Sequence, residues 1–296
     1  MARILGIGNA TLDIIHTVDD YPPENAEVRC TARELRCGGN TANLLMVLAQ
    51  LGHACSLAGV LTDDSEGWRV SDELVSNGVD ITPCRTSSTG TMPVSSVLLS
   101  AATGSRTIVH YRDLPEYCYR DFAMLDLQSF DWLHFEGRNI VALKDMLLWS
   151  REHCPAVPCS LEVEKPRAGI EQLFGFVDVL LFSRDYVRHR KYEQSEQLLQ
   201  VIHADFPEAL LFCTRGEKGA TAMDRDGRVY RQPAVAPDKI IDTLGAGDTF
   251  NAAVIDGSLS GLDIDELLHQ ACVLAGRKCT QHGFTGLVAT ETAGPS

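Results

Sequence analysis

Apolar and polar positions alternate along most of the chain between two kinds of segment. Short apolar runs, such as residues 3–8 (RILGIG) and 132–137 (WLHFEG), have the length and composition of buried strands. Apolar residues at helical spacing follow them, as in 40–52 (NTANLLMVLAQLG) and 142–152 (ALKDMLLWSRE). Because apolar strands that alternate with helices are typical of parallel sheets covered on both faces, the pattern predicts an α/β fold with a mostly parallel central sheet.

The same alternation continues through the rest of the chain. Further strand and helix pairs are expected at 54–61 with 66–78, 157–163 with 169–175, and 177–183 with 193–205. A strand at 209–214 then precedes a hairpin signal at Asp226-Gly227. Two helical stretches, at 246–261 and 265–279, close the pattern.

Two segments break this rhythm. Residues 14–36 are polar with alternating apolar positions, and residues 92–112 contain two extended runs around a turn at Gly104. We expect antiparallel strands outside the main sheet that form a small β-sheet lid. No linker interrupts the chain, so residues 1–296 are expected to form a single catalytic domain, with a disordered tail at 289–296.

Composition narrows the class of protein. The chain has 296 residues, 45% of them hydrophobic, and no apolar run long enough to span a membrane, so a cytoplasmic protein is expected. Ten scattered cysteines without a zinc-site spacing indicate reduced thiols and no protein-bound zinc. The 40 acidic residues outnumber the 26 basic ones, which argues against a nucleic-acid partner. A small anionic ligand stays compatible with this charge, because a few backbone N–H groups can hold a phosphate.

The stretch DTLGAGDTF (242–250) carries the clearest chemistry. Gly245 and Gly247 let the backbone approach a ligand, and residues 245–248, with Ala246 among them, present N–H groups at the start of a helix. Such an anion hole stabilises a phosphoryl group during transfer, and Asp248 inside it fits a general base for an attacking hydroxyl. The alternative is that Asp248 is only a first-turn acid, and this stretch alone does not decide between them.

A resemblance to a known family favours the first reading. DTLGAGDTF resembles the C-terminal signature of the ribokinase/PfkB carbohydrate kinase family, RCGGNTANLLMVLAQLG (36–52) resembles its N-terminal signature, and CTRGEKGA (213–220) matches a third family segment. The resemblance implies a ribokinase-like three-layer core with a lid, ATP as phosphoryl donor, Mg²⁺, and a homodimer formed through the lid. Whether K⁺ is also required is left open.

Several short segments resemble the ketohexokinase branch of that family. They are TGSRT (103–107), HFEGRN (134–139), LEVEKPR (161–167) and QLFG (172–175). This similarity implies transfer to a primary sugar hydroxyl, with the 1-hydroxyl of fructose as the first candidate.

The resemblance also assigns roles to residues of this chain. The residues that it assigns to sugar binding are Asp13, Gly38, Gly39, Asn40 and Asn43. It places two more, Glu136 and Arg138, beside the sugar and the γ-phosphate. Arg106 would reach the phosphates from the lid. On the nucleotide side it places Thr214, Gly216, Glu217 and Gly219, with Cys272 and Cys279 packed near the adenine. Taken from the residue types alone, Asn40 could instead be a helix N-cap.

The chain departs from the resembled branch at four places. Asn25 stands where that branch has an acid that reaches the partner subunit's sugar, so sugar contact across a dimer is in doubt. Arg215 replaces a tryptophan and Arg184 a lysine on the nucleotide side, which keeps or adds positive charge. The family's Asn-x-x-Glu metal motif is not visible around 183–189, so we expect no protein metal ligands and Mg²⁺ held through ATP oxygens and water.

Other functions remain to be weighed. GIGNAT (6–11) lacks the third glycine of a dinucleotide-binding fingerprint, and no GxxxxGK[ST] motif exists for a P-loop kinase. The open alternatives are a ribose, nucleoside or 2-keto-3-deoxygluconate kinase of the same family, or a catalytically silent sugar-binding protein on the same fold.

Overall fold

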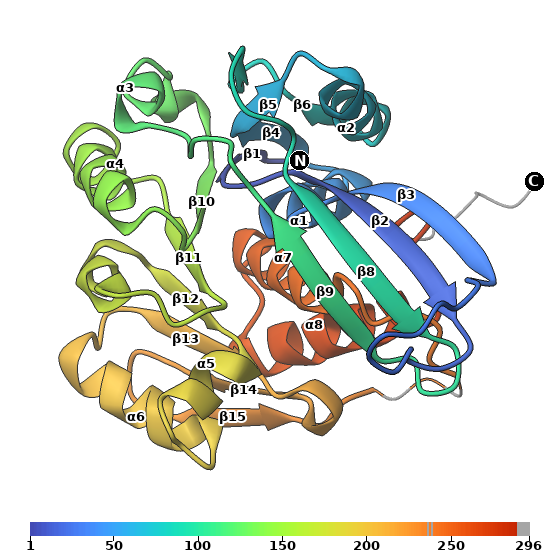
Figure 1. The fold of residues 1–296 in the computed structure, drawn as a ribbon. Helices are drawn as coiled ribbons and strands as arrows, with labels where there is room; N and C mark the ends of the chain where they lie inside the picture. The colour runs from blue at the N-terminus through green and yellow to red at the C-terminus, as the bar shows by residue number, and fades with distance from the viewer. Residues whose placement is uncertain (236, 238, 289–296) are drawn as a thin grey trace, which may run out of the picture.

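A nine-stranded sheet forms the centre of the molecule (Figure 1). The structure is a computed structural model that describes residues 1–235, 237 and 239–288. In spatial order the strands of the sheet are β15 (Val229–Gln232), β14 (Ala220–Met223), β13 (Leu210–Thr214), β12 (Val179–Phe182), β11 (Cys159–Val163), β10 (Trp132–Glu136), β1 (Arg3–Ile7), β4 (Ala54–Ala58) and β6 (Val79–Asp80). Neighbours run parallel from β13 to β6, whereas β14 is antiparallel to both of its neighbours, β13 and β15. The expected mostly parallel sheet is confirmed.

Helices cover both faces of this sheet. One core holds residues of α1 (Asn40–Gln50), α2 (Ser65–Ser76), α7 (Ala246–Leu259) and α8 (Ile264–Lys278). The other holds residues of α3 (Tyr119–Phe122), α4 (Ile140–His153), α5 (Arg184–His189) and α6 (Ser195–Asp205). Ile4 belongs to the first core and Leu5 to the second, as expected for successive residues of a strand buried on both faces. The three-layer core is therefore confirmed.

A second, four-stranded sheet stands beside the core. Its order is β3 (Ala32–Gly38), β2 (Thr11–Val18), β8 (Val94–Ser100) and β9 (Arg106–Tyr111). It is the sheet expected from 14–36 and 92–112, although β2 begins three residues earlier. The expectation of antiparallel pairing is wrong for the central pair, since β2 and β8 are parallel and joined by a long crossover. Ile15, Val97 and Leu99 pack with Leu244, which ties this lid to the segment before α7.

Several helix and strand boundaries agree with the sequence pattern. The first helix ends at Leu51, followed by Gly52 in the left-handed region at φ 91°. The hairpin between β14 and β15 turns at Gly227 with φ 78°. The two helices expected near the C-terminus are α7 and α8.

Other boundaries differ from the pattern. The run 54–61 splits at Gly59 into β4 and β5 (Val60–Thr62), and β5 pairs with β7 (Arg85–Ser87) in a separate sheet. The segment at 169–175 is largely a 3₁₀ helix, η2 (Ile170–Phe176); the structure also has η1 (Leu127–Ser129) and η3 (Gly216–Lys218). These are short elements, for which period carries little information.

Two further expectations concern the chain as a whole. All ten cysteines lie among the described residues and are free thiols. Within the described residues, no helix combines the length and apolarity that a bilayer crossing needs. The tail at 289–296 lies outside the described residues.

Candidate active site

The N-terminus of α7 has the geometry of an anion site. Gly245 is its N-cap at φ 80°, and a Cβ there would overlap the Phe284 ring, so only glycine fits. Ala246 N–H donates to Thr243 O at 3.3 Å. Among the described residues, no hydrogen bond uses the N–H groups of Gly247 and Asp248, and a Cβ on Gly247 would meet open space. These two N–H groups are available to a negatively charged ligand.

Asp248 lies in the first turn of α7 and is buried. Its carboxylate accepts a hydrogen bond from Asn43 Nδ2 at 2.7 Å. Burial is the main cause that raises the pKa of Asp248 to about 8; the charges of Glu164 and Glu136 raise it further, whereas the Asn43 hydrogen bond and the Arg106 charge lower it. A carboxylate with a pKa near the operating pH is suited to general-base catalysis.

The two glycines before α1 bring its first turn close to β1 and β2. Gly39, not Asn40, is the N-cap, and its φ of 99° favours glycine. A Cβ on Gly39 would overlap the Asn9 carbonyl, and one on Gly38 would overlap the Asp13 carboxylate. The paired glycines therefore permit a close approach between this loop and Asp13, and the N-cap alternative for Asn40 is wrong.

Asp13 is a buried acceptor on β2. Its carboxylate accepts a hydrogen bond from Thr11 Oγ1 at 2.9 Å. Burial raises its pKa above the ordinary value, and hydrogen bonds from Thr11 and Ser95 together with the Arg36 charge offset part of that rise. A buried carboxylate with acceptor capacity left over is suited to hydroxyl groups of a ligand.

Asn40 lies beside two carboxylates, Glu162 of β11 and Glu164 just after that strand. Its Nδ2 donates to Glu162 Oε2 at 3.1 Å and to Glu164 Oε2 at 3.2 Å. Glu162 also accepts from Asn251 Nδ2 of α7 at 3.1 Å. Burial, followed by the charges of Asp248, Glu136 and Glu164, raises the pKa of Glu162 well above its usual range. Glu162 therefore links α1 to α7, the helix that carries Asp248.

Glu162 and Asn251 were not identified from the sequence. A signal was nevertheless present, because Glu162 lies inside the apolar run 157–163 that predicts a buried strand. Glutamate is almost never fully buried unless its charge is paired or hydrogen-bonded. An acid at such a position indicates a polar network at that end of the strand.

Glu136 and Arg138 make protein contacts at the end of β10. Glu136 accepts from Asn9 N and Thr41 Oγ1, both at 3.0 Å. Arg138 lies 3.5 Å from Glu136 and 3.0 Å from Glu116. Both side chains are therefore held in place by neighbours at the same edge of the sheet as Asn40 and Asp248.

Two more predicted residues belong to the lid, and only Arg106 reaches this region. Arg106 donates to Thr243 Oγ1 at 2.6 Å, and its charge acts on Asp248. Asn25 lies in an exposed turn with φ 64° in the loop between β2 and β3, after the end of β2 that is remote from Asp13. Within one chain, Asn25 is not brought to the loop at residues 38–43.

The predicted nucleotide side is a turn at the carboxyl end of β13. Gly216 and Gly219 have φ of 63° and 87°, and a Cβ on Gly219 would overlap the Gln232 carbonyl. Arg215 N donates to Gly219 O at 2.7 Å, which closes the turn that follows Thr214. The turn therefore needs glycine at both positions.

Cys272 and Cys279 lie at α8. Cys272 is buried in the core, and its thiol pKa is raised to about 11, chiefly by burial. Burial also raises the pKa of Cys279. Both thiols stay protonated near neutral pH, which favours a packing role over a nucleophilic one.

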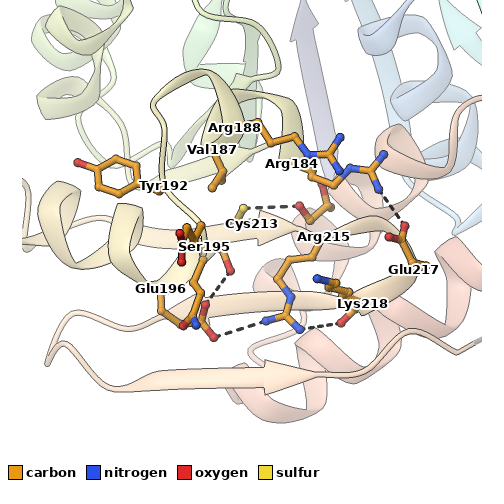
Figure 2. Close-up of a pocket in the computed structure, with 13 residues that line it drawn as sticks. Arg184, Val187, Arg188, Tyr192, Ser195, Glu196, Cys213, Arg215, Glu217 and Lys218 are labelled. Carbon is orange, nitrogen blue, oxygen red and sulfur yellow. Dashed lines mark hydrogen bonds and ion pairs between the residues drawn. The ribbon is translucent and has the colours of Figure 1, made fainter.

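A cavity of about 450 Å³ adjoins this turn (Figure 2). Four predicted nucleotide residues line it: Arg184, Thr214, Arg215 and Glu217. Arg184 pairs with Glu217 at 2.8 Å, and Arg215 lies 3.5 Å from Glu196 at the start of α6. Cys213, also in the lining, belongs to the core on the α6 side of the sheet, so the cavity is separate from Asp248.

From the sequence, no protein ligands are expected for a metal ion. Among residues 1–235, 237 and 239–288, no group of three or more His, Cys, Asp or Glu side chains is arranged to hold a metal ion. How Mg²⁺ is held therefore stays a prediction.

Comparison with known proteins decides the family. The model of the pfkB family carbohydrate kinases matches residues 1–291. The chain belongs to the pfkB family of carbohydrate kinases. It is therefore an ATP-dependent sugar kinase. It is 37% identical to ketohexokinase of Mus musculus over 298 aligned residues, which cover 97% of this chain and 99% of that one.

Solved structures show the fold of this pfkB kinase. A putative ribokinase from Agrobacterium tumefaciens superposes with a TM-score of 0.85 at 23% identity, covering 95% of this chain and 92% of that one. Ribokinase of Arabidopsis thaliana, solved with ribose and ATP, gives a TM-score of 0.74 at 19% identity, covering 95% and 94%. The expected ribokinase-like fold is confirmed.

Proposed function

We propose that this pfkB kinase transfers the γ-phosphoryl group of ATP to a primary hydroxyl of a ketose, with fructose and its 1-hydroxyl as the first candidates. The observation that carries the proposal is the buried Asp248, with a pKa of about 8, beside the free N–H groups at the start of α7. The similarity to a ketohexokinase over nearly the full length of both chains supports the choice of ketose.

In this reaction Asp248 accepts the proton of the sugar hydroxyl while the oxygen of that hydroxyl bonds to the γ-phosphorus. The bond between that phosphorus and the ADP oxygen breaks, and ADP leaves. The N–H groups of Gly247 and Asp248 stabilise the charge on the phosphoryl group in transit, and Arg106 adds positive charge from the lid. Mg²⁺ would neutralise phosphate charge when bound, and it would be held mainly by ATP oxygens and water.

The sugar is aligned by Asp13, Asn40 and Asn43. Asn43 donates its Nδ2 to Asp248, and its Oδ1 is buried with no hydrogen-bond partner among the described residues. A buried amide oxygen without a partner is costly, and a sugar hydroxyl would satisfy it. Asn43 thus holds the base with one end and is free to accept from the substrate with the other.

A sugar panel tests the proposal. Fructose, ribose, nucleosides and 2-keto-3-deoxygluconate are each incubated with ATP, and the phosphate position of any product is determined by NMR. Phosphorylation of fructose at its 1-hydroxyl in preference to the others supports the ketose assignment. A preference for one of the others assigns a different substrate class, and binding without any transfer assigns a silent sugar-binding protein.

The pH dependence of the reaction follows from the raised pKa of Asp248. Since only the ionised carboxylate can accept a proton, we expect kcat/KM for the sugar to rise about tenfold per pH unit up to about pH 8 and to level off above it. Glu164→Gln removes a negative charge that raises this pKa, so its profile should shift to lower pH. Profiles measured from pH 6 to 9.5 that coincide for both proteins would contradict the assignment.

We also propose that the kinase is a homodimer formed through the lid. On the edge strand β9, Val109 and Tyr111 are 69% and 61% exposed and share one face of the lid. An exposed apolar edge strand is usually covered or protected. The turn at Asn25 does not reach the loop at residues 38–43 of its own chain. In a dimer it could instead contact the partner subunit.

The dimer makes a specific prediction. Val109→Asp should shift the mass measured by light scattering from dimer to monomer, because a charge would be buried in the interface. Val141→Asp is the matched control, since Val141 is 78% exposed on α4, away from the lid. A monomeric mass for the unmodified protein would reject the proposal.

A further inference from the structure

A fully buried lysine lies next to the segment that forms the anion hole. Lys278 ends α8, and its side chain has no exposed surface. Its Nζ is 3.2 Å from the carbonyl oxygen of Asp242 and 3.4 Å from that of Gln281. The Asp242 carboxylate is 3.6 Å away, and the Phe284 ring centre is 5.5 Å away. A buried ammonium is costly unless such partners compensate for lost water.

The partners of Lys278 are the two segments that flank the start of α7. Asp242 begins the DTLGAGDTF stretch, and its carboxylate also accepts from Leu244 N at 2.8 Å and pairs with Arg36 of β3 at 3.0 Å. Burial alone would raise the pKa of Asp242, but Lys278, the Leu244 hydrogen bond and Arg36 hold it below its usual value. Asp242 is therefore an anion fixed between two cations and one N–H group.

Phe284 provides the second connection. It follows Gln281, whose carbonyl binds the Lys278 ammonium, and its ring packs against Gly245, the N-cap of α7. The ring therefore limits where the backbone of Gly245 can lie. Lys278 holds one side of this backbone through Asp242 and the other through the loop that carries Phe284.

We propose that Lys278 is a positioning residue for phosphoryl transfer. Its ammonium keeps the N–H groups of Gly247 and Asp248 aimed at the transferring group without itself touching a reactant. The inference rests on the proposed function, because it assumes that these N–H groups hold the γ-phosphoryl group. Donors aimed at developing charge lose much of their effect when they are displaced.

The test compares Lys278→Met with Lys144→Met. Methionine is of similar length and uncharged. Lys144, on α4 in the other helix layer, donates to Gln172 Oε1 at 3.4 Å at an exposed position, so it controls for loss of a lysine. We expect Lys278→Met to lower kcat about 10- to 100-fold with little change in the sugar KM. This decrease in kcat is smaller than that caused by losing an oxyanion-hole donor completely, because the donors are displaced and not removed. Calorimetry should show weaker binding of a non-hydrolysable ATP analogue but unchanged binding of ADP, because only the analogue carries the γ-phosphoryl group.

A merely structural lysine would give a different pattern. Equal losses of binding affinity for the ATP analogue, ADP and sugar would overturn the inference. A kcat within about twofold of that of Lys144→Met would also overturn it. If Lys278→Met does not fold, Phe284→Leu keeps the charge and removes the ring from Gly245. It should lower kcat and analogue affinity in the same way, and parental values there would also overturn the inference.

Failure of this inference can be separated from failure of the proposed function. If Asp248→Asn abolishes turnover while Lys278→Met behaves like its control, only the role of Lys278 is rejected. If Asp248→Asn retains turnover, the transfer centre itself is misplaced.

Discussion

Asp248→Asn is expected to lower turnover about 10²- to 10⁴-fold while sugar and ATP still bind. Asparagine has nearly the same shape but cannot accept the hydroxyl proton. Asn43 can turn its amide to keep one hydrogen bond to the new side chain, since its Oδ1 has no partner among the described residues. The measurement is steady-state kcat with fructose and ATP, together with the dissociation constants of both ligands.

The control for this variant lies on the same helix. Asp256→Asn changes an acid two turns further along α7, where its carboxylate contacts His53 at 2.8 Å. Its kcat should stay within about twofold of the unmodified enzyme, as is usual for a substitution away from a specific site. A kcat for Asp248→Asn that matches the control would remove the base assignment.

Asp13→Ala is expected to raise the sugar KM about 10- to 100-fold and to leave the KM of ATP nearly unchanged. The carboxylate is buried beside Gly38, and a hydrogen bond to a charged group contributes about 1.5–3 kcal/mol. Loss of sugar contacts made equally in the ground state and the transition state appears in KM rather than in kcat. Initial rates with either substrate varied at saturation of the other provide both constants.

Asp19→Ala is the matched control for this second variant. Asp19 follows β2 on the exposed loop of the lid, so its removal should change neither constant beyond about twofold. Equal increases in both KM values for Asp13→Ala would mean that the loop at 38–43 does not face the sugar.

Local chemistry made much of the fold predictable. Runs such as 3–8 and 132–137 are apolar on both faces because helices cover both sides of the sheet, so period and length identify them as buried strands. Gly52 and Gly227 mark a helix end and a hairpin because both need positive φ. The parallel pairing of β2 and β8 has no such local signal, since the segment that joins them includes α1 and α2.

The residues of the proposed site could be named from the sequence, but their contacts could not, and their roles stay predictions. The glycines and acids of 242–250 indicate an anion hole with a base through their own chemistry. The hydrogen bond between Asn43 and Asp248 joins residues 205 positions apart, and nothing in either segment specifies the other. The ion pair of Arg36 with Asp242 spans 206 positions and was missed for the same reason. Tertiary packing alone brings these groups together.

These long-range pairs limit how sugar preference could be re-engineered. Consider a chimera with its first fifty residues from one pfkB kinase and the remainder from another. It would combine amides and carboxylates that did not evolve together. The side-chain hydrogen-bond partners of Asn40 and Asn43 lie beyond residue 160, and so does Asp242, one of the two acids that pair with Arg36. Swapping the loop at 38–43 by itself would therefore disturb Asp248, the proposed base, and the two halves of the proposed site would have to be exchanged as a unit.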